Sequence, residues 1–175
     1  MIGAHYAAAQ SLITGLRQTG AAPAVLAEML GDAVARQPDD ATAGIALGLW
    51  FWDMEDWPRA IAAYRAVATR WPDDPVVRAL LGITLVRFGQ SDRGQSDLGP
   101  ELAEGGAILG AVAAQVPEIA DARLWLGIAQ SAMGDKAAAV ATLDALEPML
   151  PRDPNLHVAR AHALLALGRL REGWA

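Results

Sequence analysis

The stretch Ala41–Asp74 reads ATAGIALGLWFWDMEDWPRAIAAYRAVATRWPDD, and the spacing of its residues decides the fold. Its key positions are Gly48, Ala60, Tyr64 and Pro72. A glycine inside a helix costs about 1 kcal/mol relative to alanine, so it fits best where a second helix crosses too closely for a side chain. The spacing therefore predicts two antiparallel helices that cross at Gly48, with Ala60 and Tyr64 on the facing helix.

The same pattern recurs along the chain at a fixed period. Pro38 and Pro72 are 34 residues apart, and so are Pro117 and Pro151. A period of this length is typical of a solenoid of stacked helix pairs. We divide the 175 residues into a degenerate repeat at 7–40, repeats at 41–74, 75–119 and 120–153, and a partial repeat at 154–175.

The order Leu47, Gly48, Phe51, Ala60, Tyr64 and Pro72 resembles the tetratricopeptide repeat, W-x2-L-G-x2-Y…A-x3-F…P. The resemblance implies an all-α fold: a right-handed superhelix of antiparallel helix pairs, a TPR-like α-solenoid. We expect about four repeats plus a C-terminal helix in a single domain over residues 1–175. The resemblance also implies that the protein holds another polypeptide in a groove.

Two local signals refine the repeat boundaries. The third repeat is 11 residues longer than the 34-residue period, and its polar stretch Gly89–Pro100 reads GQSDRGQSDLGP, so we predict an enlarged inter-helix loop over 89–100. Aspartates 40, 74 and 153 precede the first helices of three repeats. A carboxylate at this place accepts hydrogen bonds from the free N–H groups of the first turn, so we expect three N-caps.

Composition and motifs narrow the function. The net charge of −6 argues against a general affinity for nucleic acid, and the chain has no cysteine. No apolar run reaches the roughly 18 residues that a membrane span needs, and no signal peptide is visible. We expect a cytoplasmic protein, or a periplasmic one if the sequence is trimmed. No nucleotide-binding or hydrolase motif occurs, so we expect no catalytic residues, metal or cofactor.

The predicted partner-binding site is an apolar stripe with polar rims. In tetratricopeptide repeats the first helices line the concave face, which implies partner contact at Ile45, Leu49, Trp52, Asp53, Ala79, Ile83, Val86, Arg87, Leu124 and Ile128. The alternative is that these residues pack internally, for example against the N-terminal helix. Relatives that bind acidic C-termini carry basic and amide side chains at the places of Ile45, Leu49, Ala79 and Ile83. The apolar residues here favour an amphipathic helix or an apolar peptide as the partner.

The C-terminal segment is a second candidate interface. Its apolar residues spread around much of the last helix and its tail, which indicates a self-association surface or homodimer at Leu164, Leu165, Leu170 and Trp174. The alternative is that the tail folds back over Leu164 and seals the end of the array.

Other functions remain open from the sequence. The chain could be a self-assembling scaffold subunit or the recognition domain of a larger enzyme. The order of repeats from Ala33 to Pro151 also resembles the TPR domains of bacterial cytochrome c maturation accessory proteins. A calcium loop at Asp92, Ser96 and Asp97 is disfavoured because it lacks the closing glutamate.

Overall fold

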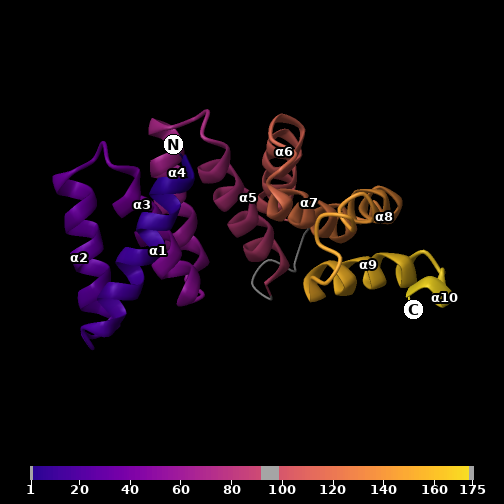
Figure 1. The fold of residues 1–175 in the computed structure, drawn as a ribbon, viewed down its shortest axis with the longest axis horizontal. Coiled ribbons are helices and arrows are strands. Elements are labelled where there is room, and N and C mark those ends of the chain that lie inside the picture. The colour runs from indigo at the N-terminus through magenta and orange to yellow at the C-terminus, as the bar shows by residue number, and fades with distance from the viewer. Residues whose placement is uncertain (1, 92–98, 174–175) are drawn as a thin grey trace. The chain divides into compact units, whose positions relative to one another are not determined.

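The computed structural model describes residues 2–91 and 99–173, and the regular structure of these residues is entirely helical (Figure 1). The helices are α1 (Ile2–Gln18), α2 (Pro23–Arg36), α3 (Ala41–Asp53), α4 (Trp57–Arg70), α5 (Pro75–Gln90), α6 (Pro100–Gln115), α7 (Ala120–Ala132), α8 (Lys136–Asp144), α9 (Pro154–Ala166) and α10 (Leu170–Gly173). The predicted all-α fold of helix pairs is confirmed. No helix in the described residues is both long and apolar enough to cross a membrane.

The helices form two compact units, Met1–Thr84 and Leu85–Ala175, and the boundary lies inside α5. In the first unit α3 is central, because it packs against α1, α2 and α4. The core of this unit includes Ala9 and Ile13 from α1, Leu26 and Leu30 from α2, and Ile45, Ala46 and Trp50 from α3. Burial of these apolar side chains is the main stabilising contribution to the unit.

In the second unit, successive helices pack on one another. Helix α7 contacts α6 and α8, and α9 contacts α8 and α10. One buried cluster joins Leu124 to Leu143, Leu146 and Leu156, and another joins Ala139, Val140, Ala163 and Leu164.

Two of the helical glycines, Gly48 and Gly127, stand where two helices cross too closely for a side chain, as predicted. A Cβ atom added at Gly48 would lie 2.4 Å from Cε1 of Tyr64, whose side chain is only 1% exposed. A Cβ atom at Gly127 would lie 2.7 Å from Cδ2 of Leu143. Both distances are too short for real atoms, so each crossing requires a residue without a side chain.

The three predicted N-caps are also confirmed. Asp40 accepts a hydrogen bond from the Thr42 amide at 2.8 Å, Asp74 accepts from the Val76 amide at 2.9 Å, and Asp153 accepts from the Asn155 amide at 2.8 Å. Hydrogen bonds from the Thr42 side chain and amide lower the pKa of Asp40.

Helix α8 is shorter than the period of the repeat predicts. It ends at Asp144, and a series of turns leads from there to Asp153. Pro148 explains the early end, because it has no N–H to donate to the Asp144 carbonyl and its ring would clash with that group. Leu146 nevertheless remains fully buried in these turns, so the segment still covers the core.

The turn between α3 and α4 contains the strained residue Glu55, with φ = 55°. Gly134 and Gly168 stand at the same place after α7 and α9, with φ of 93° and 74°. Only glycine adopts this left-handed region without a penalty, which is about 1–2 kcal/mol for other residues.

We therefore expect Glu55→Gly to raise the free energy of unfolding by about 0.5–1 kcal/mol, after the entropic cost of a more flexible unfolded chain is subtracted. Urea unfolding of the variant and of a Glu55→Gln control measures this gain. The control should show no gain, because it removes the charge and keeps the strain. A gain of equal size in both variants would assign the effect to charge instead.

Candidate partner-binding site

Two of the predicted site residues, Leu49 and Trp52, lie one turn apart on the same face of α3, and both are half-buried. The Trp52 ring meets the Trp57 ring edge to face, with centroids 5.0 Å apart and planes at 81°. Trp57 begins α4, so the pair joins the two helices of the repeat across their turn. Edge-to-face pairs contribute about 0.5–1.5 kcal/mol beyond their buried area, so Trp57 holds the Trp52 ring in place.

A polar group borders this face. Asp53, at the end of α3, forms an ion pair with Arg17 of α1, and the Arg17 guanidinium also lies 5.8 Å from the centre of the Trp50 ring. The side chains of Arg17 and Asp53 are 51% and 39% exposed, so the pair stabilises the fold by at most about 1 kcal/mol. The sequence predicted Asp53 at the polar border of the site but not its partner Arg17. The first repeat is degenerate, so its residues cannot be aligned with the repeat pattern to show which of them face α3.

Four predicted site residues are not on the surface, which corrects the sequence-based assignment. Ile45, Ala79, Val86 and Leu124 are at most 4% exposed. Ile45 shares a core cluster with Ala9 and Ile13 of α1, and Leu124 shares one with leucines of the second unit. The alternative of internal packing therefore holds for these four residues, because neighbouring helices cover the stripe at these positions.

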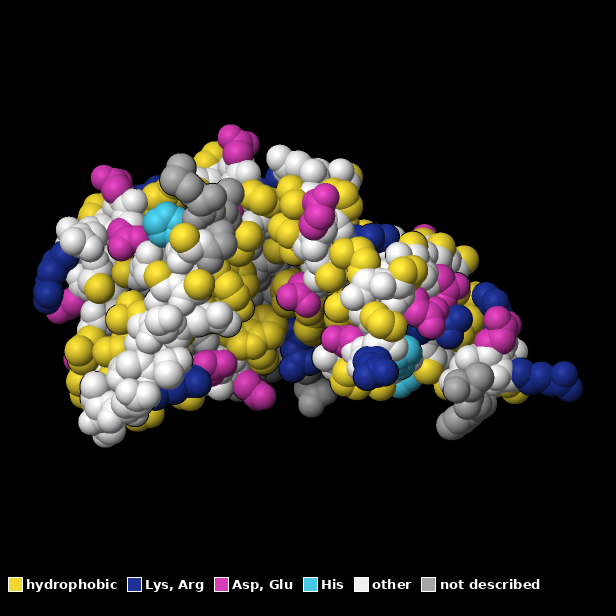
Figure 2. Space-filling view, in the orientation of Figure 1, with side chains coloured by type: hydrophobic (Ala, Val, Ile, Leu, Met, Phe, Trp, Pro, Cys, Tyr) yellow, Lys and Arg dark blue, Asp and Glu magenta, His cyan; other side chains and the backbone are white. Residues whose placement is uncertain are grey.

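The remaining predicted residues stay accessible. Ile83 is half-buried in the first unit. In the second unit, Arg87 is exposed with its guanidinium 5.8 Å from the centre of the Trp125 ring, and half-buried Ile128 lines a pocket between α7 and α9. On the face drawn in Figure 2, exposed hydrophobic side chains are interspersed with acidic and basic ones.

The predicted self-association residues are only partly exposed. Leu164 is fully buried and Leu165 half-buried, so Leu164 is not available to a second copy. Helix α10 packs on α9, and a Cβ atom at Gly173 would lie 2.8 Å from Cγ of Leu165. Leu170 is 58% exposed, and Trp174 lies outside the described residues. The described part of the tail therefore folds back onto α9, as one sequence-based alternative expected, and Leu170 stays on the surface.

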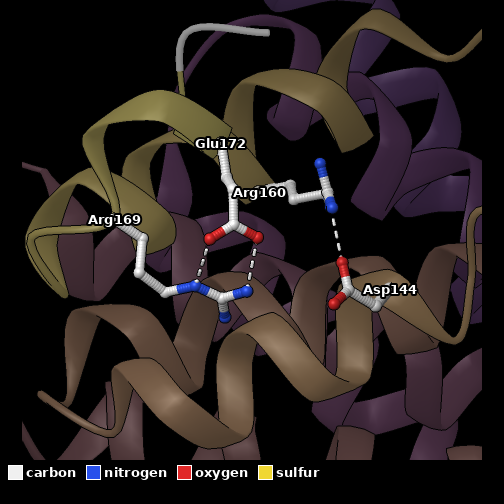
Figure 3. A network of polar contacts seen from close by, with 4 residues as sticks. All are labelled: Asp144, Arg160, Arg169 and Glu172. Carbon is white, nitrogen blue, oxygen red and sulfur yellow. Dashed lines mark hydrogen bonds and ion pairs between the residues drawn. The ribbon is translucent and has the colours of Figure 1, made fainter.

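Two ion pairs lie among the C-terminal helices (Figure 3): one joins α9 to α8, and the other is local to the start of α10. Arg160 of α9 donates to Asp144 of α8 at 2.5 Å, and Arg169 makes a two-pronged contact with Glu172 at 2.8 and 2.5 Å. The hydrogen bond to Asp144 raises the pKa of Arg160, and the one from Arg169 lowers the pKa of Glu172. Each of these four charged side chains is therefore engaged in an ion pair within the fold.

Within residues 2–91 and 99–173, no group of three or more metal-ligating side chains comes together. The disfavoured calcium loop at 92–97 falls outside the described residues.

Comparison with known proteins identifies the repeat. A family model described as tetratricopeptide repeat matches residues 27–75, 45–93 and 79–157. None of the curated proteins matches the sequence. The resemblance to cytochrome c maturation proteins gains no support from the match, whose description is the repeat alone.

Several solved structures share the fold. MamA of Desulfovibrio magneticus RS-1, from residue 41 to its end, is 15% identical over 99% of this chain and 92% of that chain, with a TM-score of 0.77. MamA of AMB-1 is 18% identical over 95% and 90%, with a TM-score of 0.72. A thermophilic repeat protein of Thermus thermophilus is 20% identical over 96% and 86%, with a TM-score of 0.68. At these identities the likeness shows the fold alone.

Proposed function

Because the chain belongs to the tetratricopeptide repeat family, we propose that it is a non-enzymatic adaptor that binds a peptide or an amphipathic helix of a partner protein. The proposed contact in the first unit is the face of α3 that carries Leu49 and Trp52. The tetratricopeptide repeat is a protein-interaction fold, so a polypeptide partner is the ligand class that the family supports.

The observation that carries the proposal is the half-buried Trp52 ring, held edge to face by Trp57. A large aromatic side chain that is already fixed in one position loses little conformational entropy when a partner covers it. Tryptophan is also enriched among the few residues that supply most of the binding energy at interfaces. Leu49, one turn earlier on α3, extends the apolar surface that an amphipathic helix would cover.

The ion pair between Arg17 and Asp53 gives this surface a polar border. Polar rims are typical of interfaces whose centre is apolar. The arrangement favours a partner segment with apolar residues on one face and polar residues on the other, and it gives no concentrated positive charge that would select an acidic tail.

We expect Trp52→Ala to weaken partner binding by about 2 kcal/mol, which is about thirtyfold in the dissociation constant, with no loss of helix content. A pull-down with the wild-type chain identifies the partner, and calorimetric titration of both forms measures the change. The matched control is Trp71→Ala, because Trp71 is also a half-buried tryptophan of the first unit but lies away from the Trp52–Trp57 pair, in a pocket that includes Pro38 and Arg70. Equal affinity of the Trp52→Ala variant and the wild type would refute the proposed contact.

A structural scaffold subunit is the second candidate, and one observation favours it. Val158, Leu167 and Leu170 of the C-terminal helices are 55%, 42% and 58% exposed, which is unusual for large apolar side chains that lie near one another in sequence. The same samples separate the two functions. A scaffold subunit would capture no separate partner and would sediment as an assembly that Trp52→Ala leaves unchanged.

A further inference from the structure

A small pocket of about 230 Å³ lies in the second unit, between α7 and α9. Its apolar lining consists of Ile128, Ala132 and Ala159, and its polar lining of Gln90, Ser131, Lys136 and His162. Pockets for drug-sized ligands are usually larger, about 300–1,000 Å³. The size therefore suits one side chain of a bound polypeptide better than a separate small molecule.

Lys136 supplies the positive charge of this pocket. Its ammonium group donates hydrogen bonds to the carbonyl oxygen of Ser131 and, at 3.3 Å, to the Ser131 hydroxyl. These contacts draw the half-buried lysine back over the end of α7. An ammonium group has three N–H donors, so one remains for a ligand.

Among residues 2–91 and 99–173, no acidic side chain balances this charge at the pocket. The described lining contains a lysine and a histidine and no carboxylate, and no described carboxylate lies within ion-pair distance of Lys136. His162 makes no hydrogen bond to another described residue, so its ring N–H is available as a further donor. The chain as a whole is acidic, with a net charge of −6. The two donors at this pocket, by contrast, suit an anion.

Lys136 is also the only lysine of the chain, since every other basic residue apart from the histidines is an arginine. Lysine carries a compact charge on a flexible stem, whereas the arginine guanidinium is a wide planar group. The compact ammonium is the group that can both turn back onto Ser131 and present a donor in a pocket of this size.

We propose that this pocket binds the carboxylate of a glutamate or aspartate side chain of the partner polypeptide, with Lys136 and His162 as donors and Ile128 under the aliphatic part. The inference rests on the proposed adaptor function. It adds one acidic residue to the chemistry of the partner, at a site in the second unit that uses neither Leu49 nor Trp52.

The test uses the full ¹³C-labelled chain and NMR at constant pH and ionic strength. The probe is N-acetylglutamate α-amide, and N-acetylglutamine amide is the matched neutral control. The Lys136 CεH2 signal is assigned directly, because the chain has no other lysine. His157, on the same helix as His162 but with its ring nitrogen 3.2 Å from the Pro151 carbonyl oxygen, is the internal reference.

With the glutamate probe, the Lys136 and His162 signals should shift along one saturation curve while His157 stays unchanged. In Lys136→Gln, the affinity read from His162 should fall about tenfold, as expected for loss of a charge-assisted hydrogen bond. An equal response to the glutamine probe, or an undiminished His162 shift in Lys136→Gln, would show that Lys136 only caps the end of α7 and would overturn the proposal. Saturation by free acetate with exclusion of the amide probe would overturn the assignment to a polypeptide.

The Trp52→Ala variant keeps the two proposals separable. It should bind the glutamate probe as the wild type does. A failure of the probe with an intact Trp52 effect on partner binding refutes only the carboxylate pocket, and the reverse pattern refutes only the α3 contact.

Discussion

Replacement of Tyr64 by alanine should lower the free energy of unfolding by about 4 kcal/mol, the largest loss that we expect from a single substitution. The Tyr64 side chain is 1% exposed and lies against Gly48. Removal of the ring leaves a cavity at the crossing of α3 and α4, and the backbone on both sides is held by helical hydrogen bonds. The cavity can therefore close only in part, and most of the lost contact energy remains lost.

The Tyr64→Phe variant is the matched control and should behave in the opposite way. The buried Tyr64 hydroxyl has no hydrogen-bond partner among the described residues, and its burial raises the pKa of the group. An unsatisfied buried polar group costs about 1–3 kcal/mol, so its removal with the ring retained should stabilise the fold by up to about 1 kcal/mol.

Urea unfolding followed by tryptophan fluorescence measures both variants. Four of the six tryptophans lie within residues 1–84, so the signal reports mainly on the first unit. If Tyr64→Phe were as unstable as Tyr64→Ala, the hydroxyl would be making an essential contact and the packing argument would be wrong.

The second large effect is expected from Gly48→Ala, which should cost about 3 kcal/mol although alanine is the better helix former. The new Cβ atom would stand 2.4–2.8 Å from three atoms of the Tyr64 ring. The ring is rigid and buried, so α3 and α4 must move apart to accept the methyl group. That movement also loosens the contacts on either side of the crossing.

The control for this experiment is Gly15→Ala in α1. A Cβ atom at Gly15 meets no atom within 4 Å, so this substitution should stabilise the helix by up to about 1 kcal/mol. A double variant, Gly48→Ala with Tyr64→Leu, should be less damaged than the sum of its single changes, because the smaller side chain leaves space for the methyl group. Strict additivity would show that the two residues do not interact and would contradict the crossing geometry.

The helix pairs and their crossings were predictable because their signals are local. Gly48 and Tyr64 stand at a fixed spacing within one repeat, and each cap is contiguous with the helix that it begins. The early end of α8 does not follow from the repeat, because the 34-residue period places the end of this helix near Pro151, whereas the helix ends at Asp144, before Pro148. That residue breaks the helix by its own chemistry, whatever the repeat frame predicts.

The binding surface was less predictable, because a periodic stripe does not tell which neighbour covers each residue. Ile45 and Leu49 lie one turn apart on α3, yet α1 helps to bury the first and leaves the second half-buried. The pocket at Lys136 and His162 depends on side chains from different helices that are 26 residues apart. No motif joins Lys136 and His162, and only the packing of α8 on α9 brings them to one pocket.

The main contacts inside each unit join helices that are first or second neighbours along the chain, as when α3 packs on α1, α2 and α4. Little polypeptide has to be ordered before such contacts form, so the entropy of loop closure is small and folding is fast. Domains generally fold as units from the N-terminus during synthesis, and the first unit contains no residue beyond Thr84. The α3 surface with Trp52 can therefore be complete on the ribosome while the second half of the protein is still being translated.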